Sequence, residues 1–153
     1  MHDMIQRYLA GPAKLRRSLE GLTAEELHFH PAPGKWSAHQ IAIHVADMDL
    51  SAAFRMRRIL AEPGSGYPGV DQDRWAVGLL YEERELEPSL FLLEALRREM
   101  TTVLIRVPES AWSQTGIHSE AGEQKLSAVL ENYTGHLERH VEQIEAIKRK
   151  LGK

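Results

Sequence analysis

The sequence predicts an all-α protein, a four-helix bundle formed by a single domain that spans residues 1–153. Three observations support this prediction. Apolar residues recur at spacings of three and four along four long segments, which is the period of an amphipathic helix. No stretch of useful length alternates apolar and polar residues as a strand does. The chain has 153 residues, the length of one ordinary domain with its own core.

The first predicted helix covers residues 2–20. Its apolar residues return to one face, with charged residues between them. They are Met4, Ile5, Tyr8, Leu9, Leu15 and Leu19. Gly11-Pro12 interrupts the pattern, and we expect a kink there because proline lacks the N–H that the helix would use.

A short turn and a loop separate this helix from the second one. Thr23 followed by Glu26 has the spacing of a capping box and predicts a short turn. The sequence Pro-Ala-Pro-Gly at 31–34 predicts a loop. Ser37 is the predicted N-cap of a second helix over residues 37–60, whose apolar positions also keep to one face.

The next segment predicts a long connection and a third helix. Residues 62–69 are rich in glycine and proline and predict a loop, and residues 71–76 predict one capped turn. Pro88 fits the first turn of a third helix, where proline is tolerated, and this helix should end before Pro108.

The last predicted helix runs from Leu126 to Leu151. Its seam positions alternate strictly between spacings of four and three, which is typical of a helix in an antiparallel bundle. These positions are Leu126, Leu130, Tyr133, Leu137, His140, Ile144, Ile147 and Leu151. Residues 113–125 show no regular pattern, and we expect an irregular connection there.

Composition and charge exclude several classes of function. The chain has 19 Lys and Arg against 22 Asp and Glu, a net charge of −3, and no basic block beyond residues 148–150, so we expect no nucleic-acid partner. Cysteine is absent, so any metal must be held by imidazole or oxygen. No segment resembles a signal peptide or approaches the roughly 18 apolar residues of a membrane span. We therefore expect a cytoplasmic protein with no membrane partner.

Three histidines form the candidate metal site. In the sequence GHLERH, His136 and His140 are four residues apart on the last helix, which places their Cβ atoms about 5–6 Å apart on one surface. His44 lies between Ile41 and Met48 on the apolar stripe of the second helix. Three inward imidazoles can converge on one divalent ion and leave an open position for water or substrate. In the alternative interpretation, His140 is a hydrogen-bonded core histidine and His136 lies at the rim.

The ligand set does not identify the metal, because zinc, nickel, iron and copper all accept imidazole.

Glu138 is two residues from each histidine of the last helix, turned by about 200°, and is expected to point to solvent rather than to act as a base. Asp47 lies one turn beyond His44 and is the candidate catalytic carboxylate, as a base or as a group that orients an imidazole. An equally open interpretation makes Asp47 a solvated acid paired with an arginine.

The other histidines are interpreted as non-ligands. His28 and His30 form an H-x-H pair before a proline turn, and residues two apart do not share a helix face. His39 precedes the inward-facing histidine of the second helix by five residues, about 140° around the helix, so we expect it to be exposed. His118 and His2 fall in a loop and at the terminus, where a solvated role is expected.

Aromatic and arginine side chains could contribute to the site. Trp36 and Tyr133 are interpreted as packing residues, since aromatics at bundle spacing belong to the core. Trp75 follows the Gly/Pro loop and either lines a pocket or packs elsewhere. Three arginines of the second helix either bind an anionic cosubstrate or form a solvated face. They are Arg55, Arg57 and Arg58.

Two stretches of the chain resemble a known family. GKWSAHQIAIHVADMD, residues 34–49, and LSAVLENYTGHLERHVEQI, residues 126–144, are similar to the two signature regions of the DinB/YfiT-like superfamily, and the resemblance covers nearly the whole chain. It implies a four-helix bundle with a divalent metal held by three histidines, which match His44, His136 and His140. It also implies a homodimer.

The resemblance narrows the expected function to a small set. Family members include thiol-dependent S-transferases that use bacillithiol or mycothiol, a mycothiol-dependent isomerase, and many proteins labelled metal-dependent hydrolases. We therefore expect a zinc, nickel or iron protein that transfers a low-molecular-weight thiol to small electrophilic molecules. The alternatives are a metal-dependent hydrolase and a non-catalytic, metal-stabilised module for binding or stress response.

Overall fold

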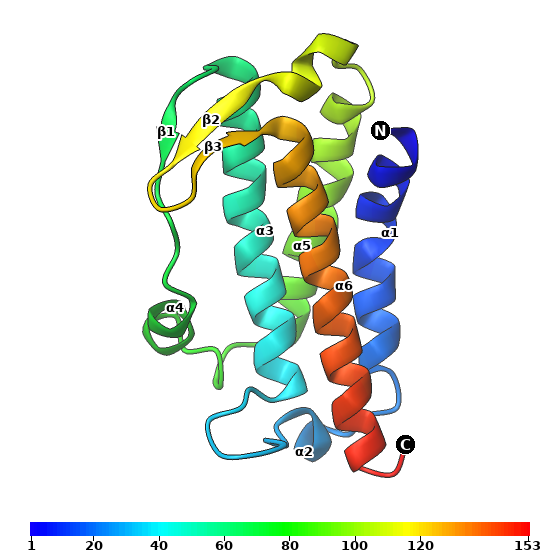
Figure 1. The fold of residues 1–153 in the computed structure, drawn as a ribbon. Helices are drawn as coiled ribbons and strands as arrows, with labels where there is room; N and C mark the ends of the chain where they lie inside the picture. Colours follow the sequence, from blue (N-terminus) through cyan, green and yellow to red (C-terminus); the bar gives the residue numbers. More distant parts are fainter.

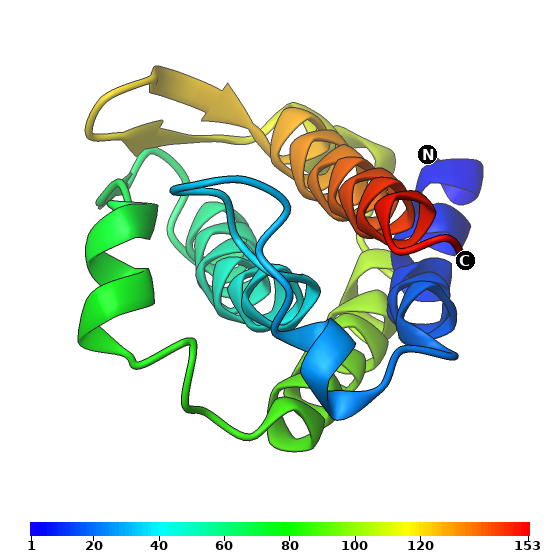
Figure 2. The same ribbon diagram turned by 90° about the horizontal axis from the view of Figure 1, so that it is seen from below.

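Four long helices build the body of the protein (Figure 1). The structure is a computed structural model that describes residues 1–153. The helices are α1 (His2–Leu19), α3 (Ala38–Ala61), α5 (Leu86–Leu104) and α6 (Leu126–Lys150). Each packs against two neighbours in the order α1, α6, α3, α5, as the view along the bundle in Figure 2 shows. The predicted four-helix bundle is confirmed.

Local signals in the sequence fix where the helices begin. Ser37 accepts a hydrogen bond from the backbone N–H of Gln40, and the Gln40 side chain accepts one from the Ser37 N–H, so a capping box starts α3. Thr23 and Glu26 form the same motif at the start of α2 (Ala24–Leu27). The third long helix begins two residues before Pro88, which therefore lies in the first turn, where backbone N–H groups have no helical partner.

The connections hold three short strands that the sequence did not indicate. β1 (Gly66–Tyr67) pairs in parallel with β2 (Thr115–His118), and β2 pairs antiparallel with β3 (Gly122–Lys125), with Ile117 opposite both Gly66 and Glu123. The prediction of an irregular connection over 113–125 was therefore wrong. These strands have two to four residues each, which is too short to display a period of two.

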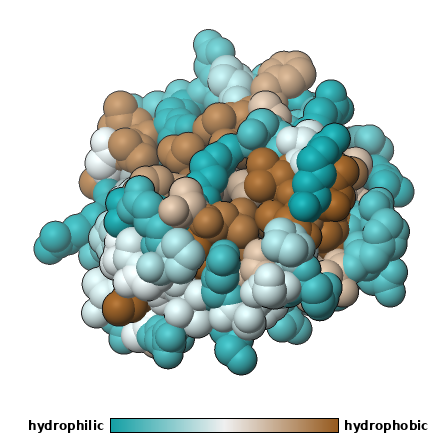
Figure 3. Space-filling view, turned by 90° about the horizontal axis from the view of Figure 1, so that it is seen from above, coloured by the Kyte–Doolittle hydropathy of each residue, from teal (hydrophilic) through white to brown (hydrophobic).

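Two further short helices complete the chain. They are α4 (Gln72–Gly78), which corresponds to the predicted capped turn, and a 3-10 helix at Glu109–Ser113. Seen from the sheet end, the surface shows apolar areas broken up by hydrophilic side chains (Figure 3). None of the helices combines the length and the apolar character that a membrane crossing needs.

The core has two apolar parts along the bundle. One surrounds Met56 and Met100 toward the sheet, and the other surrounds Val45 and Leu93 toward the opposite end. A polar layer lies between them, because the helices contribute Asp49, Arg97 and other polar residues at the intermediate turns. Core residues such as Val45, Leu137 and Ile144 flank the candidate histidines along α3 and α6, and their packing fixes the helices that carry the histidines.

Candidate metal centre

The side chains of His44, His136 and His140 meet between α3 and α6. Nε2 of His136 lies 3.2 Å from Nε2 of His44 and 3.1 Å from Nε2 of His140. One nitrogen from each of the three rings lies within 4.8 Å of the others. Three nitrogens bound to one tetrahedral ion at about 2.0–2.1 Å would be about 3.3 Å apart. The geometry of the cluster therefore fits a divalent metal.

The two helices place these rings by simple periodicity. His136 and His140 come from adjacent turns of α6, and His44 comes from the buried face of α3. The Trp36 ring packs 4.7 Å from the His44 ring, and His44 itself is fully buried. The structure thus brings together the three histidines that the sequence singled out. His140 has the hydrogen-bond partner of the alternative interpretation, Gln143, but His136 lies between the other two rings rather than apart from them.

Burial keeps these imidazoles neutral. The pKa of His44 is lowered to about 3, mainly by loss of solvent and to a smaller extent by the nearby His140. Loss of solvent and the two neighbouring histidines lower the pKa of His136 to about 3, and burial also lowers the pKa of His140. A neutral imidazole has the lone pair that a metal ligand needs. The three rings therefore need not release a proton before they bind a metal at neutral pH.

The second ring nitrogens have different surroundings. Nδ1 of His140 lies 2.8 Å from Oε1 of Gln143. Nδ1 of His44 and Nδ1 of His136 are buried and have no hydrogen-bond partner in the protein. One of the three candidate ligands is thus held by a neighbouring side chain, and the other two are held by packing.

A surface pocket of about 460 Å³ opens beside His140. Trp36 and Gln143 contribute to its wall, and Lys35, Lys150 and Asp73 provide the charged groups. The packing role predicted for Trp36 is confirmed, since this ring is partly buried against the core, but the same ring also lines the pocket. Trp75 does not line this pocket and packs against the apolar part of the core near the sheet.

Asp47 does not contact the histidines. Both of its oxygens accept hydrogen bonds from Arg84, at 2.8 and 3.2 Å. The carboxylate is buried rather than solvated. The structure thus shows the arginine partner of the alternative interpretation and gives Asp47 no position as a base beside the imidazoles. The sequence could not reveal this, because Arg84 lies 37 residues away in the turn before α5.

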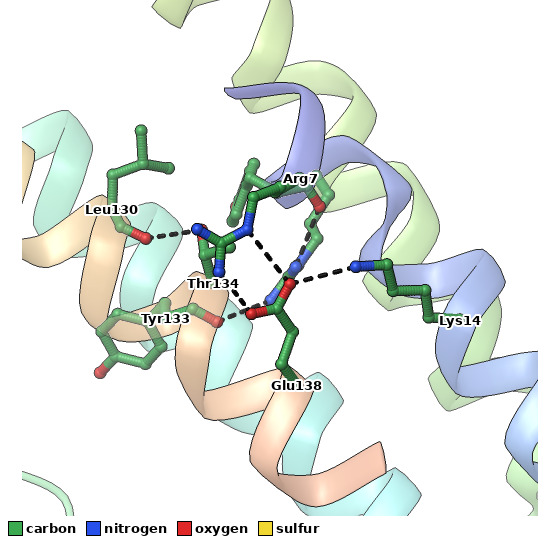
Figure 4. A network of polar contacts seen from close by, with 8 residues as sticks. Arg7, Lys14, Leu130, Tyr133, Thr134 and Glu138 are labelled. Atoms are coloured by element: carbon green, nitrogen blue, oxygen red, sulfur yellow. Dashed lines mark hydrogen bonds and ion pairs between the residues drawn. The ribbon is translucent and has the colours of Figure 1, made fainter. Parts of the chain in front are cut away.

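Glu138 is turned away from the histidines, as expected, but it does not simply face solvent. It accepts hydrogen bonds from Arg7 at 2.6 Å and from Lys14 at 3.1 Å, both on α1 (Figure 4). The bond from Arg7 is the main reason that the pKa of Glu138 lies below its usual value. Glu138 therefore joins α6 to α1 and is unavailable as a base.

The remaining histidines form local contacts outside the cluster. His28 and His30 lie 3.1 and 3.6 Å from the carboxylate of Glu82. His39 was expected to be exposed and is instead buried, with its ring stacked 4.2 Å from that of His28. His39 follows the expected helical angle, but the segment after α2 covers this face of α3. His118 lies in β2 and accepts backbone N–H groups of the hairpin turn.

The three arginines of α3 divide into two kinds. Arg57 pairs with Glu99, and Arg58 pairs with Glu62, so these two follow the prediction of a solvated face. Arg55 is buried, donates to the Tyr133 hydroxyl at 2.5 Å and to the Pro68 carbonyl at 3.0 Å, and has no carboxylate partner. Its burial depends on the loop at β1, which sequence periodicity does not place.

Comparison with known proteins identifies the family. The model of the DinB superfamily matches residues 7–144. A Geobacillus kaustophilus (strain HTA426) protein is 27% identical over 154 residues, with 97% of this chain and 86% of the relative covered. A Geobacillus thermodenitrificans (strain NG80-2) protein is 29% identical over 143 residues, covering 92% and 80%. Both carry the description "putative metal-dependent hydrolase".

A solved structure shows the same fold. YfiT from Bacillus subtilis, described as "a probable metal-dependent hydrolase with an unusual four-helix bundle topology", superposes with a TM-score of 0.93. The two chains are 24% identical, and the match covers 99% of this chain and 87% of YfiT. At this identity the likeness concerns the fold, whereas the family model spans most of the sequence. The chain is therefore a member of the DinB superfamily.

Proposed function

We propose that this chain is a metal-dependent enzyme that transfers a low-molecular-weight thiol to small electrophilic molecules. In this proposal His44, His136 and His140 hold one divalent ion, which can be zinc, nickel or iron. The observation that carries it is the convergence of three neutral imidazole nitrogens, at 3.1 and 3.2 Å, beside an open pocket. The cluster contains no fourth histidine or carboxylate ligand, so an ion held there keeps a position for a further ligand.

A divalent ion, when bound, supplies Lewis acidity and lowers the pKa of a thiol or water that enters its open position. The transfer needs no redox partner, because it is a substitution. The thiol loses its S–H proton to solvent, its sulfur forms a bond to an electrophilic carbon, and the bond from this carbon to the leaving group breaks with its electron pair. In the protein, Trp36 and Gln143 form the pocket wall along which the reactants approach His140.

The absence of a general base beside the histidines favours a thiol over water. Asp47 accepts hydrogen bonds from Arg84, and Glu138 accepts hydrogen bonds from Arg7 and Lys14. Neither carboxylate is therefore free to act as a base. A free thiol has a pKa of about 8.5, whereas that of water is about 15.7. A thiol therefore needs much less help to ionise, and a centre with metal ligands alone can activate it.

Hydrolysis is the second candidate function. The Geobacillus relatives carry the description of a metal-dependent hydrolase, and three histidines with an open position also suit activation of water. The pocket contains Asp73 of α4 as its only carboxylate, which would have to serve as the base.

One experiment separates these functions. Zinc-loaded and nickel-loaded protein is incubated with monochlorobimane and, in turn, bacillithiol, mycothiol, glutathione and coenzyme A, and the S-conjugates are measured by mass spectrometry. A parallel series contains esters and amides without any thiol. We expect metal-dependent conjugation that the His140→Ala variant loses. Turnover confined to the series without thiol would establish the hydrolase instead, and metal-loaded protein inactive in both series would contradict both enzymes.

A further inference from the structure

Gln143 connects the histidine cluster with the pocket beside it. It lies three residues after His140 on α6, on the same surface of the helix. Its Oε1 is 2.8 Å from Nδ1 of His140, and its side chain also lines the pocket. No other protein group contacts the second nitrogen of a candidate ligand, because Nδ1 of His44 and of His136 lack partners.

The contact determines which nitrogen of His140 carries the proton. A carboxamide oxygen only accepts hydrogen bonds, so with Oε1 of Gln143 facing the ring, Nδ1 is the donor. In a neutral ring Nε2 then has the free lone pair, and it is Nε2 that points toward His136, at 3.1 Å from Nε2 of that residue. With the amide turned the other way, its N–H₂ group would face Nδ1 and the proton would move to Nε2. That tautomer would direct an N–H at the place where an ion binds.

We propose that Gln143 is a positioning residue that holds His140 in the tautomer required of a metal ligand. The inference rests on the proposed metal site, but the hydrogen bond itself exists in the metal-free protein and can be tested there. Outer partners of this kind orient the ring of a ligand histidine, and their loss weakens metal binding by about 10–100-fold. Gln143 is the only residue of the pocket wall that holds a candidate ligand in this way.

Three variants isolate the hydrogen bond. Gln143→Met removes the amide and keeps the length and helix propensity of the side chain. Gln143→Glu keeps an accepting oxygen at the same position, so it should keep the proton on Nδ1 of His140 and the zinc affinity of the wild type. Gln72→Met alters a second glutamine of the pocket wall that makes no bond to a histidine, and it serves as the control. Gln72 and Gln143 are both exposed, so we expect all three proteins to fold.

The first measurement is the tautomer of His140 in ¹⁵N-labelled, metal-free protein at neutral pH, from the nitrogen shifts and couplings of its ring. We expect a proton on Nδ1 in the wild type, in Gln143→Glu and in Gln72→Met, and a population with the proton on Nε2 in Gln143→Met. A role in folding alone would not move this signal. A wild-type ring protonated on Nε2 would overturn the inference.

The second measurement is zinc affinity, by competition with a chelator. Gln143→Met should bind zinc about 10–100-fold more weakly than the wild type, and Gln143→Glu and Gln72→Met should bind close to the wild type. Equal affinity of Gln143→Met and wild type would refute the positioning role. Failure of the wild type to bind zinc would instead refute the proposed metal site, so the two failures are distinguishable.

Discussion

Arg97 and Asp49 form a fully buried ion pair in the middle of the bundle. The guanidinium donates to both carboxylate oxygens, at 2.9 and 2.8 Å, and neither side chain is exposed. Arg97 also donates to the backbone carbonyls of Tyr8 on α1 and Tyr133 on α6. One side chain of α5 thus contacts the three other long helices. Its contact on α6, Tyr133, lies one turn before His136.

Arg97→Met should be strongly destabilising. It leaves the Asp49 carboxylate buried without its partner, and breaking a buried pair in this way costs about 3–5 kcal/mol. Urea unfolding measures the loss. Arg98→Met is the matched control, because Arg98 pairs with Glu94 on the exposed surface of the same helix, where a pair is worth at most about 1 kcal/mol. Similar losses for both variants would show that the buried pair does not hold the bundle together.

Gly11→Ala should also destabilise the protein. A Cβ at this position would overlap Nη1 of Arg97 and lie 3.0 Å from Cδ1 of Leu137, and overpacking of this kind costs about 1–3 kcal/mol. At Gly135 of α6 the nearest atom is the flexible end of Arg139, so Gly135→Ala should gain up to about 1 kcal/mol in helix stability. Thermal unfolding of both variants tests the difference, and equal effects would contradict the close packing at Gly11.

Asp47→Asn should lower stability and leave zinc affinity unchanged. The substitution weakens the bonds from Arg84, which hold the turn before α5 against α3, but it removes no contact with a histidine. Unfolding and zinc titration are measured on the same protein sample. A loss of zinc affinity as large as that of His44→Ala would restore Asp47 as a functional partner of the metal site.

The metal-free protein should lose stability as the pH falls below about 6.5. The pKa of His44 and that of His136 are about 3 in the folded protein and about 6.5 in the unfolded chain. Between these values the unfolded chain binds more protons, so the free energy of unfolding increases with pH. The contribution is complete above about 6.5 and is lost progressively toward 3.

Urea unfolding between about pH 5 and 7, above the range in which most carboxylates titrate, measures this slope. His44→Leu should flatten it, because it removes one of the histidines whose pKa is lowered by burial. A wild-type protein whose stability is independent of pH over this interval would show that the histidines are not held neutral by burial.

Periodicity predicted the four helices and the inward orientation of the candidate histidines, because Ile41, His44 and Met48 on one helix and Leu137 and His140 on another belong to continuous stripes. These features depend on local spacing, which a sequence displays directly, whereas the pairing of the two helices that brings His44 to His136 joins residues 92 positions apart and was implied by the family resemblance. The capping signal at Ser37 was equally local, and the structure confirms it.

Contacts between distant segments could not be predicted in this way. The burial of His39, the partner of Asp47 and the burial of Arg55 all depend on loops that pack against α3. The buried pair of Asp49 and Arg97 joins residues 48 positions apart, and nothing in either helical pattern marks it. The homodimer, the cytoplasmic location and the thiol cosubstrate remain predictions from the family resemblance and composition.

Titration of the metal-free protein with zinc tests the central claim most directly. The wild type should bind one ion, and replacing His44, His136 or His140 by alanine should remove most of the affinity, because each ring contributes one of the three converging nitrogens. His28→Ala and His118→Ala should bind as the wild type does, since these rings lie outside the cluster. Wild-type affinity in His44→Ala and His136→Ala would contradict the site.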